Sequence, residues 1–428
     1  MSGNKDIRHG IDWSLIIIWA VLMFLGWVNI YASVHNSTSP DLVSRPEKQL
    51  LWIGTALILA VFILFVFKPR MWAVLSTPGY ILILILLLAT IFLASDIKGS
   101  RSWLTFGPIS FQPAEISKIT TSLALATLLG TSSFKLNNFR NWATTLFVLA
   151  LPALAILAEK ETGSMLVYAG FLFVLYREGM SGWILGFIFL SILLFIFTLT
   201  SPVWVPFVVL AVCISIFFLS KLVQSKRSRR RKAKINRIVV TSLLSLAAGA
   251  AIIFMSDFAF NHILQDHQRG RIEVLLGLKE DPSGAGYNVN QSMIAIGSGG
   301  FLGKGYLQGT QTTYGFVPEQ STDFIFCTVG EEWGFFGCLF VIAVYALLIW
   351  RILEDSEQAR EGFTRIYGYS LASCLFMHLI INISMTIGMM PVIGIPLPLF
   401  SYGGSSLWAF TMMIFIFIAL NRQEKKYF

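Results

Sequence analysis

The sequence has little charge. Only 13% of its 428 residues are Asp, Glu, Lys or Arg, whereas 55% are apolar. A soluble domain carries roughly 25% charged residues. The composition therefore argues against soluble domains and indicates a protein that lies within a membrane.

Cysteine is also scarce, and no metal spacing is present. His262 and His267 are separated by five positions, too loosely to predict a metal site even with Asp266 between them. We interpret the cysteines as small side chains packed in or beside apolar runs, without a disulfide framework. The four cysteines, none of which forms a Cys-x-x-Cys pair, are Cys213, Cys327, Cys338 and Cys374.

Acidic residues are fewer than basic ones, 23 against 32, which gives a net charge of +9. The run from Lys221 to Arg237 holds nine of the basic residues and no acidic residue. Such a run can bind nucleic acid. It lies between two apolar runs, however, so we interpret residues 221–237 as a basic cytoplasmic loop that follows the positive-inside rule and predict no nucleic-acid partner.

Long apolar runs dominate the rest of the chain. The first begins at Trp13, behind Lys5 and Arg8, and at about 20 residues it is too long for a signal-peptide core. We predict an uncleaved signal anchor and twelve membrane spans in an all-helical protein. The spans lie near 13–33, 49–67, 74–94, 113–131, 142–158, 163–176, 181–199, 203–220, 238–256, 324–350, 366–388 and 404–420.

The basic residues between these runs alternate in a way that places both termini in the cytoplasm. With that topology, residues 257–323 form a large extracytoplasmic loop before a helix that starts near residue 324. Three prolines between residues 391 and 398 exclude regular helix there. We predict one transmembrane domain over residues 1–428.

Residues 286–326 are the most informative segment, because they are polar and rich in glycine inside an apolar chain. Irregular backbone is too costly in lipid, so this segment must lie in water or line a cavity. Its GSGGFLGKG stretch, Gly297–Gly305, fails the phosphate-loop pattern at two positions, so no nucleotide site is predicted. Its glycines are expected to permit tight turns.

Asp323 ends this polar segment, directly before an apolar run. A carboxylate at the membrane edge is able to accept a proton from an attacking hydroxyl. The alternative is structural, because Ser321 and Thr322 are good helix caps and an acidic residue suits the first turn of a helix. The residue types alone do not separate these two interpretations.

Glu115 and Lys118 are three residues apart in the run that Pro113 opens, so they share one helix face. Charges within a bilayer are costly and usually face the interior of the helix bundle in pairs. The pair is therefore either a structural ion pair or part of a polar cavity that continues to Asp323.

Cations in the extracytoplasmic segments oppose the positive-inside trend and are suited to an anionic partner such as a pyrophosphate. The alternative for those beside Trp103 is simple interfacial placement. They are Lys98, Arg101, Arg269, Arg271 and Lys304. We interpret the Glu159-Lys160-Glu161 cluster as a solvated helix end.

Three stretches resemble the SEDS family (shape, elongation, division and sporulation). They are GSRSWLTFGPISFQPAEISK at Gly99–Lys118, the segment from Gly284 to Phe326 with its PEQSTDFIF motif, and NISMTIGMMPVIGIPLPLFSYGGSS at Asn382–Ser406. The loop Gly309–Thr312 favours the elongation branch over the division branch. Two places differ from the family pattern: Ser102 stands where Arg is common, and Glu159–Gly163 replaces the usual Gln-Pro-Asp-Leu-Gly.

The resemblance implies a SEDS-type bundle of ten core spans, to which this chain adds an extra hairpin at roughly 203–256. It implies a peptidoglycan glycosyltransferase in the bacterial inner membrane that polymerises lipid II during cell elongation and shape maintenance, inverts the anomeric centre and releases undecaprenyl pyrophosphate. The implied partners are lipid II, lipid-linked glycan and a class B penicillin-binding protein transpeptidase. The alternatives are a lipid II flippase and a non-catalytic scaffold.

The resemblance also assigns residues. The essential aspartate of the family falls on Asp323, which is the predicted catalytic residue, and its intramembrane Glu and Lys fall on Glu115 and Lys118. The remaining predicted substrate-binding residues are Lys98, Arg101, Lys304 and Glu319. A divalent cation, Mg or Mn, is the one cofactor expected beside these residues, and no protein metal ligands are predicted.

Overall fold

The computed structural model describes residues 10–37, 39–94, 100–106, 109–131, 134, 136, 138–225, 231–264, 266–279 and 285–426. Its regular structure is almost entirely helical, which confirms the predicted all-helical class. The chain forms two compact units, one made of residues 1–180 and 287–428 and the other of residues 181–286. One transmembrane domain over the whole chain stays a prediction.

The larger unit holds most of the helices. They are α1 (Trp13–Val34), α2 (Pro40–Val43), α3 (Arg45–Phe65), α4 (Pro69–Leu93), α5 (Pro113–Leu129), α6 (Phe139–Ala158), α7 (Thr162–Val167), the 3-10 turn η1 (Tyr168–Gly170), α8 (Phe171–Arg177), α13 (Ala285–Gly299), α14 (Ile325–Gln358), α15 (Gly362–Thr386) and α16 (Gly404–Lys426). A short antiparallel hairpin, β1 (Leu104–Phe106) and β2 (Ile109–Phe111), precedes α5 and pairs Thr105 with Ser110.

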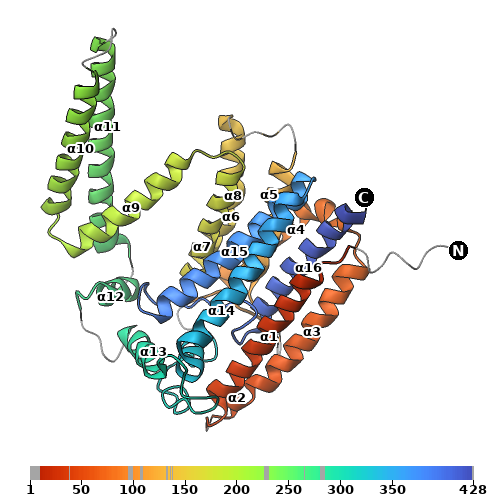
Figure 1. Ribbon diagram of the computed structural model, residues 1–428. Coiled ribbons are helices and arrows are strands. Elements are labelled where there is room, and N and C mark those ends of the chain that lie inside the picture. Colours follow the sequence, from red (N-terminus) through yellow and green to blue (C-terminus); the bar gives the residue numbers. More distant parts are fainter. Residues whose placement is uncertain are drawn as a thin grey trace. The chain divides into compact units, whose positions relative to one another are not determined.

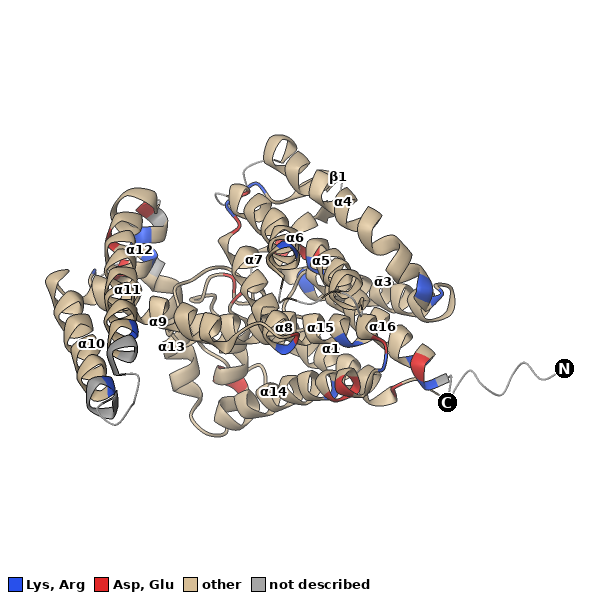
Figure 2. Ribbon diagram, turned by 90° about the horizontal axis from the view of Figure 1, so that it is seen from above, with Lys and Arg blue, Asp and Glu red and all other residues tan. Residues whose placement is uncertain are grey.

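Ten helices among the described residues are long and apolar enough to cross a membrane. The remaining two of the twelve predicted spans are α5, which has 17 residues, and the chain from α7 to α8, Thr162–Arg177. Figure 2 shows that most of the helix length carries neither acidic nor basic residues. The protein is a multi-pass membrane protein.

Proline and one aspartate fix the starts of several helices. Pro46, Pro69 and Pro113 lie in the first turns of α3, α4 and α5, where a missing N–H costs little. At α1 the side chain of Asp12 accepts hydrogen bonds from the backbone N–H groups of Ser14 (3.0 Å) and Leu15 (3.3 Å). These signals explain why the helices begin where the apolar runs begin.

The helices α15 and α16 form the centre of the larger unit. Most of both helices is buried, and α15 packs against α5, α8, α14 and α16 (Figure 1). The helix α16 in turn packs against α3 and α5. Residues on α15 can therefore contact several elements that lie far apart in the sequence.

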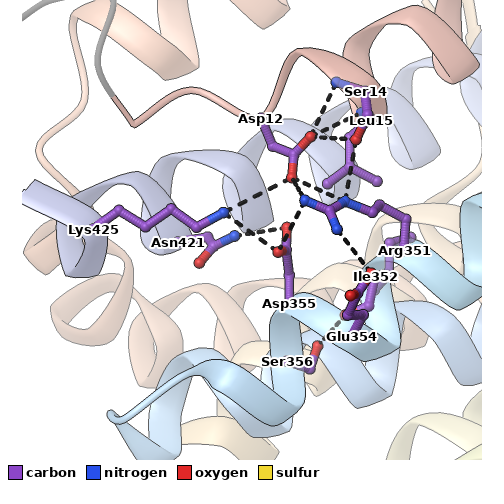
Figure 3. A network of polar contacts seen from close by, with 10 residues as sticks. All are labelled: Asp12, Ser14, Leu15, Arg351, Ile352, Glu354, Asp355, Ser356, Asn421 and Lys425. Atoms are coloured by element: carbon purple, nitrogen blue, oxygen red, sulfur yellow. Dashed lines mark hydrogen bonds and ion pairs between the residues drawn. The ribbon is translucent and has the colours of Figure 1, made fainter.

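A polar network joins α1, α14 and α16 at the ends of these helices (Figure 3). The Arg351 guanidinium is 2.9 Å from an oxygen of Asp12, and Lys425 is 3.3 Å from an oxygen of Asp355. The Asn421 amide donates to Asp355 at 2.8 Å. Burial raises the pKa of Asp12, but hydrogen bonds from Ser14, Asp355 and Arg351 outweigh it and hold that pKa well below the usual value.

The helix α14 starts at Ile325, which confirms the expected start near residue 324, but it is interrupted at Gly334. That residue has φ 65° and ψ −159°, and a Cβ there would lie 2.3 Å from the backbone nitrogen of Gly303. Only glycine fits this combination of positive φ and close approach. The bend leaves a short helix, 325–333, which is buried over residues 325–332 and packs against the glycine-rich segment.

The segment before α14 contains more regular structure than the sequence indicated. Residues 257–323 include the π turn η2 (Ala259–Ile263), α12 (Asp266–Leu275) and α13. Residues 387–403 are not helical, as their prolines predicted.

The smaller unit consists of α9 (Gly182–Thr200), α10 (Trp204–Ser225), α11 (Arg231–Phe258), η2 and α12. The helices α10 and α11 pack closely, because a Cβ on Gly249 would lie 2.4 Å from a methyl carbon of Leu210. They correspond to the predicted extra hairpin at 203–256. The ends of the predicted basic loop 221–237 belong to these helices, and residues 226–230 lie outside the described residues.

Candidate functional site

Asp323 lies in a turn directly before α14 and is partly exposed, between the buried residues Ser321 and Phe324. The residue at the helix N-cap is Phe324, and no side chain caps the helix there. The Thr322 hydroxyl instead contacts Glu319, whose carbonyl and carboxylate oxygens are 3.2 and 3.1 Å away. The turn therefore does not have the helix-capping arrangement that was the structural alternative for this motif.

Two elements hold this turn in place. The Asn382 amide, from α15, donates to the backbone carbonyls of both Asp323 and Ile395 at 2.7 Å. The Ser401 hydroxyl donates to the Thr322 carbonyl at 2.6 Å, and the Tyr402 N–H donates to the Ser321 carbonyl at 2.9 Å. The backbone of Asp323 is thus fixed by α15 and by the irregular segment 387–403.

The Asp323 carboxylate faces that irregular segment. Its Oδ2 atom would lie 3.3 Å from a Cβ placed on Gly394, which has φ 77°. A side chain at position 394 would therefore crowd the carboxylate, and the positive φ also favours glycine there. At Gly394 the segment thus combines a close approach to Asp323 with a backbone conformation that only glycine adopts readily.

A cation that the sequence did not single out lies beside this turn. Arg45, at the start of α3, donates a hydrogen bond to the Ser321 hydroxyl, and its guanidinium carbon is 5.3 Å from the centre of the Tyr402 ring. Arg45 and Ser321 are 276 positions apart in the sequence. The structure thus brings an arginine within two residues of Asp323, and no local pattern could have indicated it.

Glu115 and Lys118 form the ion pair that their spacing predicted, with 2.7 Å between Oε1 and Nζ. Both side chains are almost fully buried, at 2% and 0% exposure. The Lys118 ammonium also lies 2.9 Å from Nε2 of His378 and 5.2 Å from the centre of the Phe410 ring. The pair is therefore part of a buried cluster with a histidine from α15.

The tautomer of His378 follows from its two neighbours. Its Nδ1 atom is 3.1 Å from the Pro396 carbonyl oxygen, which can only accept, so Nδ1 carries the proton. Nε2 is then an acceptor for the Lys118 ammonium. His378 and Asn382 are one helical turn apart on α15 and contact the same irregular segment, at Pro396 and Ile395. The buried cluster is thus connected to the backbone that holds Asp323.

Lys304 lies in a second polar cluster. Its ammonium is 2.6 Å from the buried carboxylate of Glu331 and 2.8 Å from the Thr310 hydroxyl. Glu331 also accepts from the backbone N–H groups of Thr310, Gln311 and Thr312 at 2.7 to 2.9 Å. Glu331 therefore organises the loop 304–312, and the substrate contact expected of Lys304 stays a prediction.

Arg101 has an exposed side chain, and its backbone N–H donates to the Glu159 carbonyl at 3.0 Å. Ser100 and Ser102 donate to the Glu161 carboxylate at 2.7 and 3.0 Å. The loop that carries Arg101 is thus fixed to the end of α6. Lys98, the other cation predicted there, lies outside the described residues.

The interpretation of residues 159–161 as a solvated helix end is wrong for Glu159, because its side chain is fully buried. The Thr90 hydroxyl donates to its carboxylate. Burial raises the pKa of Glu159 to about 7, the Thr90 bond opposes that rise, and the neighbouring charge of Glu161 adds to it. The helix α4, which supplies Thr90, covers a position that the sequence presented as solvent-facing.

The predicted residues therefore fall into separate groups. Asp323 and Glu319 share one turn, Glu115 and Lys118 connect to the same region through α15, and Lys304 and Arg101 lie in other loops. The sequence analysis did not identify Arg45, His378 or Asn382.

Within the described ranges, no three His, Cys, Asp or Glu side chains gather as a metal-binding group. The described side chains thus do not fit a metal ion that is held by protein ligands alone.

The chain was compared with known proteins. A model of the FtsW/RodA/SpoVE family, described as a cell cycle protein, matches residues 12–230 and 233–426. The peptidoglycan glycosyltransferase MrdB of Escherichia coli K12 is 32% identical over 92% of this chain and 88% of its own. The peptidoglycan glycosyltransferase RodA of Treponema pallidum is 30% identical over 96% and 98%.

Solved structures have the same fold. A chain of a peptidoglycan synthase complex, solved in a study of how polymerization and crosslinking are coordinated, matches with a TM-score of 0.68 and 26% identity over 97% of this chain and 98% of that one. The crystal structure of the rod shape determining protein RodA of Thermus thermophilus matches with a TM-score of 0.61 over 97% of both chains. Its 23% identity makes that likeness one of fold alone.

Proposed function

This chain belongs to the SEDS family, the family of FtsW, RodA and SpoVE, and from that premise we propose that it is a peptidoglycan glycosyltransferase that polymerises lipid II during cell elongation. The names of the relatives support transfer of sugars rather than the alternative of lipid II flipping. The single observation that carries the catalytic assignment is the Asp323 turn, which presents a partly exposed carboxylate from a backbone held by Asn382, Ser401 and Tyr402.

In the proposed reaction, Asp323 accepts the proton of an acceptor sugar hydroxyl as its oxygen attacks the anomeric carbon of the donor. The bond from that carbon to the lipid pyrophosphate breaks, and undecaprenyl pyrophosphate leaves with its electron pair. A single displacement inverts the centre, from the α-linked donor to the β-linked product. Fixed backbone contacts favour this role because they hold the base without reorganisation during the reaction.

Charge develops on the departing pyrophosphate, so a cation must lie near it. Arg45 is a candidate that the fold adds to Arg101 and Lys98, since it contacts Ser321 in the same turn as Asp323. A guanidinium suits a phosphate because it donates two parallel hydrogen bonds. A divalent cation at this place stays a proposal, and no step here depends on it.

Glu115 and Lys118 are too deeply buried in this conformation to favour direct contact with a sugar. Their link to Pro396 through His378 supports a role in holding the segment that faces Asp323. Substrate contact by this pair, and by Glu319, stays a prediction.

The protein is proposed to lie in the bacterial inner membrane with both termini in the cytoplasm, so that Asp323 is at the outer leaflet. The synthase complex among its structural relatives supports a partner that crosslinks the glycan. A class B penicillin-binding protein is the partner we propose.

The test is polymerisation of lipid II by the detergent-purified chain. Native protein should produce glycan strands, and Asp323→Asn should lower the rate by about 100-fold or more while the protein still folds. Asp41→Asn, an exposed carboxylate in α2, is the matched control and should retain activity. Strand formation by Asp323→Asn at the native rate would remove Asp323 from the mechanism.

The same assay with EDTA tests the divalent cation, since a required metal would make native activity sensitive to chelation and restorable by Mg or Mn. If the native protein makes no polymer but moves lipid II across vesicle membranes, the flippase alternative holds instead.

A further inference from the structure

A cavity of about 350 Å³ lies where the end of α3, the start of α4 and the end of α16 meet, at the opposite ends of these helices from Asp323. Its walls carry three cationic side chains beside apolar ones. The wall residues include Lys68, Arg70, Arg422, Leu64, Ala419 and Gln423. No acidic side chain lines it among the described residues, so the cavity has a net positive charge.

Two other cations at this end of the unit have acidic partners. Arg351 pairs with Asp12 at 2.9 Å, and Arg365 pairs with Glu178 at 3.0 Å. Within the described part of the chain, by contrast, the side chains of Lys68 and Arg70 form no ion pair and no hydrogen bond. Among the described residues, Lys68 and Arg70 are therefore two cations of the cavity wall that no acidic side chain compensates.

Arg422 is held against the cavity by the end of α3. Its guanidinium carbon lies 5.9 Å from the centre of the Phe65 ring, and its Nη1 atom lies 3.5 Å from the Leu64 carbonyl oxygen. These contacts limit its movement, so part of the entropic cost of binding an anion with this side chain is already met.

The surface beside the cavity is apolar and exposed. Phe65, Val66 and Met71 have 56%, 60% and 42% of their surface accessible. In a multi-pass membrane protein such side chains at the end of a span face lipid. A ligand at this place thus meets cations at one end and hydrocarbon at the other.

We propose that this cavity binds the phosphate headgroup of an anionic phospholipid. Lys68, Arg70 and Arg422 contact the phosphate, and the acyl chains lie along Phe65 and Met71. Basic pockets between helices are suited to such headgroups, because each Lys or Arg near an anionic lipid surface adds to the attraction. A free phosphate is also an anion, but it would leave the apolar flank without a role.

The experiment uses the purified full-length chain with phosphatidylglycerol or phosphatidylcholine, and native mass spectrometry counts the lipids that each molecule retains. We expect one tightly held phosphatidylglycerol that phosphatidylcholine does not replace. The Lys68→Gln/Arg70→Gln variant should lower the affinity for that lipid by about tenfold or more. Both side chains are exposed, so the variant should keep its fold and its melting temperature.

The matched control is Arg140→Gln/Arg237→Gln, which removes two exposed cations outside the cavity and should leave the retained lipid in place. Equal losses in the two double variants would overturn the proposal, as would retention of phosphatidylcholine to the same extent. A competition arm adds millimolar inorganic phosphate. Release of the lipid by phosphate at that concentration would indicate a site for free anions and would also overturn the assignment to lipid. Because polymerisation is measured separately, failure here leaves the proposed enzyme activity untouched.

Discussion

Asn382 and Asp323 are joined by a 2.7 Å hydrogen bond from the side-chain amide of Asn382 to the backbone carbonyl of Asp323. The same amide donates to Ile395 at 2.7 Å, so one buried side chain on α15 holds the two segments that face each other across the Asp323 carboxylate. The position of that carboxylate therefore depends on a residue that does not need to touch substrate.

Replacing Asn382 should reduce the rate of polymerisation more than it reduces the stability of the fold. Asn382→Ala removes two hydrogen bonds, worth about 1–3 kcal/mol of folding free energy together, and releases the Asp323 turn. We expect a fall of about tenfold or more in the rate of polymerisation from misplacement of the base. Melting temperature and lipid II polymerisation are measured on the same preparation.

Asn29→Ala is the control for Asn382→Ala, because Asn29 is also buried and its side-chain amide donates to the Leu25 carbonyl at 2.8 Å within α1. It should lower the melting temperature without a specific loss of activity. Equal activity losses in the two variants would mean that Asn382 acts only through stability.

Lys118→Met should destabilise the protein, because it leaves the carboxylate of Glu115 buried without its cation. Breaking a buried ion pair in this way costs about 3–5 kcal/mol. The double variant Glu115→Gln/Lys118→Met removes both charges and should recover part of the loss in melting temperature. If the double variant is less stable than Lys118→Met, the pair is not the source of the effect.

Arg351 should contribute more to the stability of the fold than its exposed partner Glu354. Arg351→Gln leaves Asp12 and Asp355, which are 8% and 1% exposed, with Lys425 as their nearest cation, and we expect a loss of about 2 kcal/mol. Glu354→Gln removes only an exposed i,i+3 pair and should change stability by less than about 0.5 kcal/mol. Chemical unfolding of the two variants in detergent gives the comparison, and similar losses would contradict the network shown in Figure 3.

Glu159 should make stability depend on pH near neutrality. Its pKa is raised from 4.5 to about 7 by burial, so the folded state holds a proton that the unfolded state loses. The stability that this proton adds to the folded state is fully present below pH 4.5. It is lost as the pH rises through 7, by at most about 3 kcal/mol. Melting temperatures at pH 5 and pH 8 should therefore differ less in Glu159→Gln than in the native protein.

The exposed Glu47 supplies the control for this measurement. Glu47→Gln should keep the native difference between pH 5 and pH 8. An unchanged pH dependence in Glu159→Gln would show that another group is responsible.

The sequence predicted those parts of the site that depend on neighbouring positions. The polar segment before an apolar run indicated Asp323, and a spacing of three placed Glu115 and Lys118 on one helix face, where the structure finds them 2.7 Å apart. The prolines between 391 and 398 excluded helix, and the chain is irregular there. Each of these signals is local, so it does not depend on how the helices pack.

Other residues could not have been found in this way. Arg45 contacts Ser321 across 276 positions, and His378 contacts Lys118 across 260. Neither has a distinctive local pattern. Glu159 was expected in solvent because its neighbours are charged, but α4 covers it.

Composition and hydropathy alone determined that the chain spans a membrane many times and that its irregular segments must avoid lipid, because an unpaired backbone group in hydrocarbon costs several kcal/mol. Only the packing of α3, α14, α15 and α16 decided which side chains surround Asp323. Contacts between helices depend on how side chains fit together across the bundle, and one sequence records that fit only when the chain is folded.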